Sequence, residues 1–127
     1  RGILIWGART LDGASSEWQY ISVRRTAIMI GQSIKRALTP FALEPNDAKT
    51  WNKLRNLIEN FLFGLWKQGA LKGTKPEHAY VVHVGLGSTM TDDDVTNGLL
   101  KLSVMIALLR PAEFLILAFQ QKQSSAG

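Results

Sequence analysis

Two short stretches of the sequence carry residue types that could bind a phosphate or a metal ion. The segment GLGST at 85–89 follows a β-prone run, as phosphate-binding loops do. It lacks the spacing that ends in Lys-Ser/Thr and the full dinucleotide-binding fingerprint. The carboxylates of Asp92, Asp93 and Asp94 suit hard divalent cations, but the further ligands of a calcium-binding loop are missing. Acidic residues in the first turn of a helix complement its dipole, and we prefer that interpretation.

The side chains that most often act as catalysts or soft-metal ligands are scarce. His78 and His83 are the only histidines, and neither stands in a metal-binding spacing. We expect His83, on a strand, to be a partly buried structural residue. There is no cysteine, which excludes disulfides, thiolate zinc sites and cysteine nucleophiles. The sequence therefore predicts no enzyme, no metal site and no cofactor.

Length and composition indicate one globular domain. The chain has 127 residues, of which 46% are hydrophobic and 20% charged. No apolar run reaches the roughly 20 residues of a membrane helix. The net charge of +5 could suit nucleic acid, an acidic lipid surface or an acidic protein. The cations are spread over several elements without interleaved aromatics, which favours an ordinary solvated surface. Because the opening residues lack an initiator Met, we expect a piece of a longer chain.

Periodicity predicts the elements of the first half of the chain. Apolar residues recur at helical spacing on two long segments, and their stripes, including Ile30, Ile34, Trp51, Phe61 and Trp66, are assigned to the core. In chain order we expect a strand at 3–6, a loop at 7–17, an extended segment at 18–21, a helix at 23–38 stopped by Thr39-Pro40, a short strand at 41–45, and a long helix capped by Asn46 or Asp47 and ended by Gly69 or Gly73.

The second half reads mainly as strands. In chain order we expect a strand at 79–84, a loop at 85–89, a turn of helix opened by a Thr91–Asp94 capping box, a strand at 100–108, a break at Arg110-Pro111, a strand at 114–119, and a mobile polar tail at 120–127. The fold class that follows is α+β, an α/β sandwich in which a small mixed sheet packs against two main helices.

The closing strand is apolar on both faces. Phe114, Ile116 and Ala118 point one way, and Leu115, Leu117 and Phe119 point the other. Such a strand is either central and buried on both faces within its own domain, or available for pairing with another chain. The residue pattern leaves both interpretations open.

A series of segments in a fixed order carries a family resemblance. These are GILIWGARTL, YISVRRTAIMIGQSIKRAL, EPNDAKTWNKLRNLIENFL, LWKQGALKGTKPEHAY and RPAEFLILAFQQ. Together they resemble the C-terminal domain of contractile tail sheath proteins, over nearly the whole chain. The segment VGLGSTMTDDDVTNG is most similar to the subgroup in phage-tail-like extracellular contractile injection systems of the antifeeding-prophage type.

The resemblance implies a structural subunit that polymerises helically around an inner tube and contracts to drive the tube through a target envelope. It implies residues 1–112 as the inner, tube-facing domain core and 113–127 as a C-terminal arm strand with a polar tail. In this family the terminal arms of neighbouring subunits add strands to the sheet of this domain. The expected inter-subunit arm is Glu113, Phe114, Leu115, Ile116, Leu117, Ala118, Phe119, Gln120 and Gln121; the hinge is Arg110 and Pro111; the receiving strand carries Leu100, Leu102, Val104 and Ile106.

The resemblance also implies partners. These are other sheath subunits in a homo-oligomer, with or without sheath paralogues, the inner tube protein, and baseplate and terminator proteins, with no nucleic acid and no membrane insertion. Assembly is expected in the bacterial cytoplasm, as part of a virion or a released phage tail-like particle. Lys67, Lys72 and Lys75 are candidates to face an acidic tube. The alternatives are a monomeric regulatory domain that binds a ligand or a protein, and a nucleic-acid-binding module.

Overall fold

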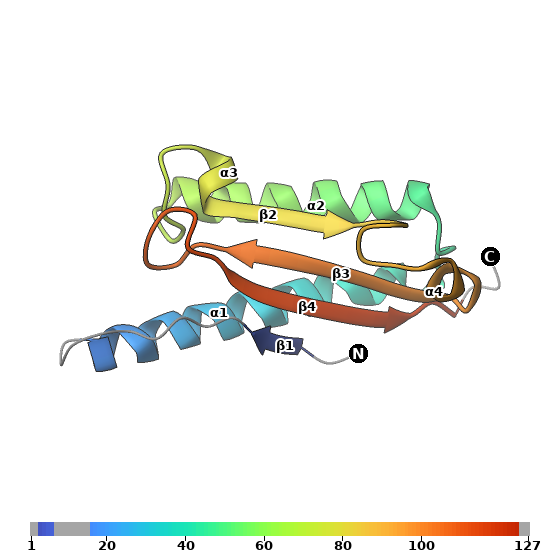
Figure 1. The fold of residues 1–127 in the computed structure, drawn as a ribbon, viewed down its shortest axis with the longest axis horizontal. Helices are drawn as coiled ribbons and strands as arrows, with labels where there is room; N and C mark the ends of the chain where they lie inside the picture. The colour runs from blue at the N-terminus through green and yellow to red at the C-terminus, as the bar shows by residue number, and fades with distance from the viewer. Residues whose placement is uncertain (1–2, 7–15, 125–127) are drawn as a thin grey trace.

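The computed structural model describes residues 3–6 and 16–124 of the chain, shown in Figure 1. Its elements, in chain order, are β1 (Ile3–Trp6), α1 (Ser16–Leu38), the 3-10 helix η1 (Thr39–Leu43), α2 (Ala48–Lys67), α3 (Pro76–Ala79), β2 (Tyr80–Val84), α4 (Asp92–Thr96), β3 (Leu99–Ile106) and β4 (Leu115–Lys122). The strand expected at 3–6 is confirmed, while the loop expected at 7–17 falls mostly outside the described residues.

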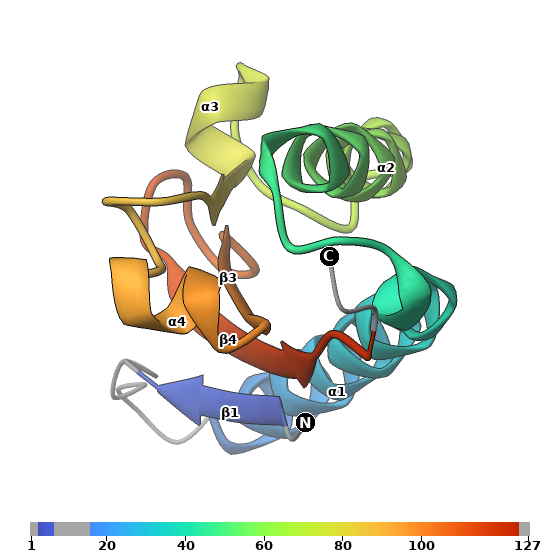
Figure 2. The ribbon, with the colours of Figure 1, turned by 90° about the vertical axis from the view of Figure 1, so that its right-hand side faces the viewer.

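The strands form one four-stranded sheet in the order β1-β4-β3-β2. Neighbouring strands run antiparallel in all three pairs, so the sheet is antiparallel and not mixed. In the register, Val104 of β3 lies between Val82 of β2 and Leu117 of β4. The long helices α1 and α2 lie on one side of the sheet, and α4 lies on the other (Figure 2). The α+β class is confirmed.

One core lies between the two long helices and the sheet. Ile30 and Ile34 come from α1, Ile58 comes from α2, and Leu102 and Val104 come from β3; all are at most 2% exposed. Trp51 is buried as expected, while Phe61 and Trp66 are half-buried and pack against the edge of this core. Burial of this apolar surface on a single side of the sheet is the main force that holds the helices to it.

The structure differs from the sequence expectation at the start of α1 and in the segment that follows α1. The segment 18–21 is helical, not extended, because α1 begins at Ser16. The β-preference of its aromatic residues is weak beside the hydrogen bond that each added residue contributes to an existing helix. The segment 41–45 is not a strand either, since η1 spans Thr39–Leu43 with Pro40 in its first turn. Proline removes no needed donor there, and its fixed φ suits the start of a new helix.

Both ends of α2 carry the expected caps. The Asp47 side chain accepts a hydrogen bond from the main-chain N–H of Thr50 at 3.1 Å. At the other end, Gly69 has a φ of +88°, and its N–H donates to the Trp66 carbonyl at 3.0 Å. The N–H of Ala70 donates to the Leu65 carbonyl at 3.0 Å, which completes a Schellman motif. Gly69, rather than Gly73, therefore ends the helix.

The second half agrees with expectation except in a few details, one of which is that β3 spans Leu99–Ile106 and not 100–108. The short helix α3 was not expected and takes Ala79 out of the strand that we expected at 79–84. β3 alternates between half-buried and buried residues, as its pattern predicts. Thr91 and Asp94 form the expected capping box at the start of α4. His83 is exposed and not partly buried, because it alternates along β2 with Val82 and Val84, whose side chains face the core. β4 also extends to Lys122, beyond the expected end at 119.

Candidate assembly interface

The strand expected to serve as an inter-subunit arm lies inside this chain's own sheet. β4 pairs with β3 over eight residues, from Ile106↔Leu115 to Leu99↔Lys122. On its other side it pairs with β1, from Trp6↔Ile116 to Ile3↔Phe119. In the single chain, therefore, β4 is a central strand of the sheet, and the division of the chain at residue 112 stays a prediction. Exchange of this strand between subunits stays a prediction.

The two faces of β4 are buried to different degrees. Leu117 is 0% exposed and Phe119 is 3% exposed, because both face the core under the helices. Ile116 and Ala118 lie on the opposite face, beside Met105 and Ser103 of β3, and are half-buried. The apolar pattern on both faces thus reflects one fully covered face and one partly open face.

The expected receiving strand is the strand that β4 contacts. Leu100, Leu102, Val104 and Ile106 are each at most 2% exposed, and all four face the core. Leu102 stands opposite Phe119, and Val104 stands opposite Leu117. If β4 were exchanged between subunits, the incoming strand would find these same partners, so the exchange would have the form of a domain swap.

The expected hinge is a tight connection between β3 and β4. Arg110 and Pro111 are exposed, and the Arg110 guanidinium pairs with the Glu113 carboxylate at 3.3 Å. Ala112 has a φ of +61°, in the left-handed region that non-glycine residues seldom adopt. Its N–H donates to the His78 carbonyl at 2.8 Å, which ties the connection to α3. The short connection thus stores backbone strain of about 1 kcal/mol or more.

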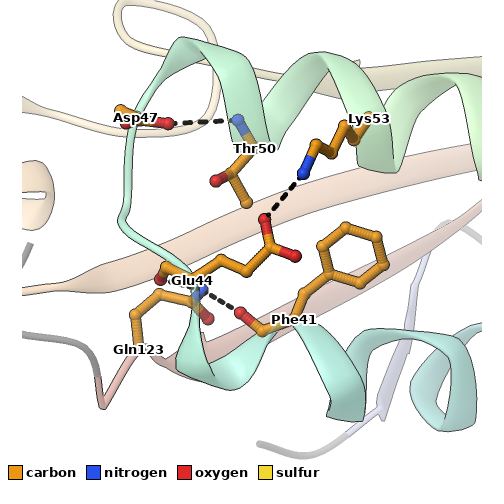
Figure 3. Close-up of polar contacts among 6 residues, drawn as sticks. All are labelled: Phe41, Glu44, Asp47, Thr50, Lys53 and Gln123. Atoms are coloured by element: carbon orange, nitrogen blue, oxygen red, sulfur yellow. Dashed lines mark hydrogen bonds and ion pairs between the residues drawn. The ribbon is translucent and has the colours of Figure 1, made fainter.

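The segment expected to be a mobile polar tail is ordered as far as Ser124. Gln120–Lys122 is part of β4, and Gln123 is 3% exposed. The Gln123 side-chain amide donates hydrogen bonds to the carbonyls of Phe41 and Glu44, the latter at 2.9 Å (Figure 3). Its main-chain N–H donates to the Gly98 carbonyl at 2.7 Å. The tail expectation is therefore wrong for 120–124, and 125–127 lies outside the described residues.

Two neighbours of Gln123 reach the same connection. The Gln121 side-chain amide donates to the Leu38 carbonyl at 2.8 Å and to the Gln123 side-chain oxygen at 3.1 Å. The N–H of Ser124 donates to the Ala42 carbonyl at 2.7 Å. We call Gln121, Gln123 and Ser124 the clasp. It binds main-chain carbonyls at the end of α1, in η1 and at Glu44, which directly follows η1.

Sequence reasoning missed the clasp because its residues are polar and follow an apolar strand. The available signal was the amide content of QQKQS at 120–124. A glutamine amide carries two donors and an acceptor, so it can bind several main-chain groups at once. Clustered glutamines after a buried strand therefore indicate capping as readily as a solvated tail.

The three lysines proposed to face a tube lie on one connection. Lys67 is the last residue of α2, Lys75 directly precedes α3, and Lys72 lies between them. All three are exposed. The Lys67 ammonium lies 5.7 Å from the centre of the Phe63 ring, and that of Lys72 donates to the Gly69 carbonyl at 3.4 Å. The structure thus gathers three cations at the end of the molecule where α2 and α3 meet (Figure 1).

In the loop and the acidic cluster that raised ligand-binding alternatives, Thr89 and Asp94 make internal contacts. The Thr89 hydroxyl donates to the Lys101 carbonyl at 2.6 Å and accepts from the Gly85 N–H at 3.2 Å. The Thr91 N–H donates to the Asp94 carboxylate, which lowers the pKa of this group, and Lys101 at 3.2 Å lowers it further. Within residues 3–6 and 16–124, no group of three or more ligating side chains is placed to hold a metal.

The same described ranges contain no helix with the length and hydropathy needed to cross a bilayer.

Comparison with known proteins gives one family. Residues 14–122 match the model of the phage tail sheath C-terminal domain. A chain in the baseplate of the anti-feeding prophage is 47% identical, with a TM-score of 0.66 over 77% of this chain and 27% of that one. A chain of the PVC sheath complex, from an extracellular contractile injection system in its contracted state, is 44% identical, with a TM-score of 0.70 over 86% of this chain and 30% of that one. No curated protein matches the chain. This chain spans less than a third of the length of each of the two solved chains.

Proposed function

The chain belongs to the phage tail sheath C-terminal domain family, and on this premise we propose that it is part of a structural subunit of a contractile sheath. In this proposal the full-length subunit polymerises helically around an inner tube. Contraction of the sheath then drives the tube through a target envelope. The subunit acts by changing its packing and not by catalysis, and it needs no cofactor.

The observation that carries the proposal is the combined agreement of sequence and fold. The family match spans residues 14–122, and the similarity to the contracted PVC sheath complex covers 86% of the chain at 44% identity. At that identity the likeness extends to side chains as well as to the backbone. The chain in the anti-feeding prophage baseplate, which is 47% identical, also comes from a phage-tail-like assembly and supports the proposal. The proposed partners are other sheath subunits, the inner tube protein, and baseplate and terminator proteins, with assembly in the bacterial cytoplasm.

We further propose that β4 is exchanged between subunits in the assembled sheath. Exchange keeps the pairing of β4 with β3 and the burial of Leu117 and Phe119. The contacts that stabilise the single chain would then join two subunits. The connection at 107–114 supports this, since strained hinge loops favour domain swapping and opening would release the φ of +61° at Ala112. A strand that crosses between subunits would keep them connected through a large rigid-body movement.

The hydrogen bonds of the clasp must break before β4 can be exchanged. Leaving the sheet requires β4 to break the side-chain bonds from Gln121 and Gln123 to the carbonyls of Leu38, Phe41 and Glu44. An exchanged β4 would form them again with the neighbour's α1–α2 connection. The clasp therefore holds β4 in one register, whether the strand belongs to the same chain or to the next.

The test is electron microscopy of the full-length protein expressed with its tube partner. The proposal predicts striated sleeves around tubes. A subunit that stays dispersed and monomeric at high concentration would instead favour the regulatory binding domain. Deleting 113–127 is a poor test, because it also removes Leu117 and Phe119 from the core. Variants that leave the core intact are needed to separate assembly from folding.

A further inference from the structure

The outward face of α1 combines apolar and basic side chains. Ile21 is 48% exposed, Ile28 39% and Met29 44%. Exposed cations and a glutamine lie three or four positions from these apolar residues, and therefore on the same side of the helix. We call this set the α1 stripe; it comprises Ile21, Arg24, Arg25, Ile28, Met29, Gln32, Lys35 and Arg36. No acidic residue occurs between 21 and 38. Single exposed apolar residues are ordinary, but a row of them among like charges marks an interaction surface.

Most of the cations of the α1 stripe have no partner in the described chain. The side chains of Arg25, Lys35 and Arg36 make no hydrogen bond or ion pair within residues 3–6 and 16–124. Within the described residues, the charges of Arg25, Lys35 and Arg36 are therefore not neutralised by ion pairs. The stripe fits a partner surface that offers carboxylates next to an apolar side chain.

Such a surface exists on the opposite side of the same domain. Leu86 is 53% exposed, and its main chain bridges to Met90, one residue before the cap of α4. Asp92 and Asp93 are exposed in the first turn of α4. Unlike Asp94, their carboxylates have no hydrogen-bond or ion-pair partner in the described part of the chain. We call Leu86, Asp92 and Asp93 the acidic corner. It pairs one exposed leucine with two free carboxylates, which is the complement of the stripe.

We propose that the α1 stripe of one copy of this chain docks on the acidic corner of a second copy. The elements α1 and α4, which carry the two surfaces, lie on opposite sides of the sheet (Figure 2), so the stripe of a chain does not meet the acidic corner of the same chain. A contact between two different patches of identical chains is heterologous, and it repeats without closing unless the rotation forms a ring. That is the symmetry which a helical sleeve requires, so the inference rests on the proposed function and assigns residues to it.

The contact is small, and its effect comes from repetition. A few exposed charge pairs and apolar contacts give little affinity to two isolated subunits. In a sleeve each subunit makes the contact twice, once with its stripe and once with its acidic corner. Contacts that are individually weak then act together with the other subunit interfaces. The contact also weakens as salt rises, because its charges are exposed.

The experiment is a charge swap in the full-length subunit. The variants are Arg25→Asp, Asp93→Arg and the double variant that carries both. The readout is the lowest protein concentration at which sleeves form in the presence of the tube, followed by light scattering and electron microscopy. We expect each single variant to raise this concentration about fivefold, and the double variant to restore it. Lys49→Glu is the matched control, since Lys49 is an exposed cation on α2 with no ion pair among the described residues.

The possible outcomes separate this inference from the proposed function. Sleeves that form equally well from wild type and from both single variants overturn the contact and leave the sheath assignment intact. Loss in the single variants without rescue in the double variant also overturns it, because the stripe then meets another partner. If the wild type forms no sleeves, the sheath proposal fails. Sedimentation velocity of the same four proteins at low salt then tests the contact by itself, and absence of wild-type self-association overturns it.

Discussion

Gln123 and Glu44 are joined by a hydrogen bond from the Gln123 side-chain amide to the Glu44 carbonyl at 2.9 Å, across 79 positions of sequence. Glu44 in turn holds Lys53 through an ion pair at 3.2 Å, and Asp47 caps α2 three residues further on (Figure 3). The end of β4 is thereby fixed to the start of the long helix. If β4 moves, either the α1–α2 connection moves with it or these hydrogen bonds break.

Replacing Gln123 with alanine should destabilise the domain. The change removes the donor for the carbonyls of Phe41 and Glu44 in a site where Gln123 is 3% exposed. Loss of such bonds costs about 1–3 kcal/mol in the free energy of unfolding. Urea denaturation of the 127-residue chain measures it. Gln120→Ala, at an exposed position of the same strand, is the control and should change stability by no more than about 0.5 kcal/mol. Equal effects of both changes would contradict the role of the clasp.

Adjacent residues of β4 should differ in their contribution to stability. Leu117→Ala leaves a cavity in a site with 0% exposure and should cost about 2–5 kcal/mol in the free energy of unfolding. Ile116→Ala, on the half-buried face, should cost clearly less, because solvent or neighbouring side chains can fill the space. Denaturant midpoints of the two variants give the comparison. A reversed order would mean that β4 presents its other face to the helices.

The capping box should contribute to the acid stability of the domain. The hydrogen bond from the Thr91 N–H, followed by Lys101, lowers the pKa of Asp94 in the folded state. A group with a lowered folded pKa stabilises the protein above its unfolded pKa, near 3.9 for aspartate, and loses this contribution as pH falls through the folded value. Stability of Asp94→Asn should therefore fall less steeply below about pH 4 than that of the wild type.

The matched control for this measurement is Asp92→Asn. It removes the same charge from α4 and leaves the hydrogen bonds between Thr91 and Asp94 in place. The comparison is made by following thermal unfolding across pH 2.5–6, an interval chosen to span the carboxyl titration. If Asp94→Asn and wild type give parallel curves, the capping box does not bear on acid stability.

Charge reversal at the end of α2 should weaken binding of the sheath to its tube. The triple variant Lys67→Glu, Lys72→Glu and Lys75→Glu places three negative charges on the exposed connection between α2 and α3. If an acidic tube surface faces it, the association should weaken by at least about tenfold at low salt and recover partly as salt rises. Co-sedimentation of sheath with tube measures this. Lys49→Glu serves as the control for charge reversal elsewhere on α2. Unchanged binding of the triple variant would show that these lysines do not face the tube.

The local features of the fold could be predicted from the sequence, and the non-local ones could not. The alternation of β3 and the caps at Asp47 and Thr91 depend on residues within a few positions of each other, and the structure has all of them. The segments 18–21 and 41–45 were mispredicted because β-prone aromatic residues outweighed the helical continuity of their neighbours. For the clasp, no local pattern shows that Gln123 will meet Phe41.

The place of β4 shows the same limit at the level of assembly. An apolar strand with residues such as Leu117 on one face and Ile116 on the other fits the interior of a sheet. That pattern is identical whether the neighbouring strand belongs to the same chain or to another, since the pairing partners are the same. The structure of the single chain places β4 between β1 and β3, and only the assembled state distinguishes pairing within a subunit from exchange.

The most direct measurement of strand exchange uses a cysteine pair across β3 and β4. Ser103 and Ala118 are register partners, and the 127 residues contain no cysteine. Any cysteine elsewhere in the full-length subunit is first replaced by serine. Directly opposed residues of antiparallel strands lie within the Cα distance that a disulfide spans. The full-length Ser103→Cys, Ala118→Cys variant is assembled into sleeves, oxidised and run on a denaturing gel without reductant, beside each single variant. Exchange of β4 predicts a ladder of covalent multimers from the double variant alone. A single band of internally cross-linked monomer would contradict it.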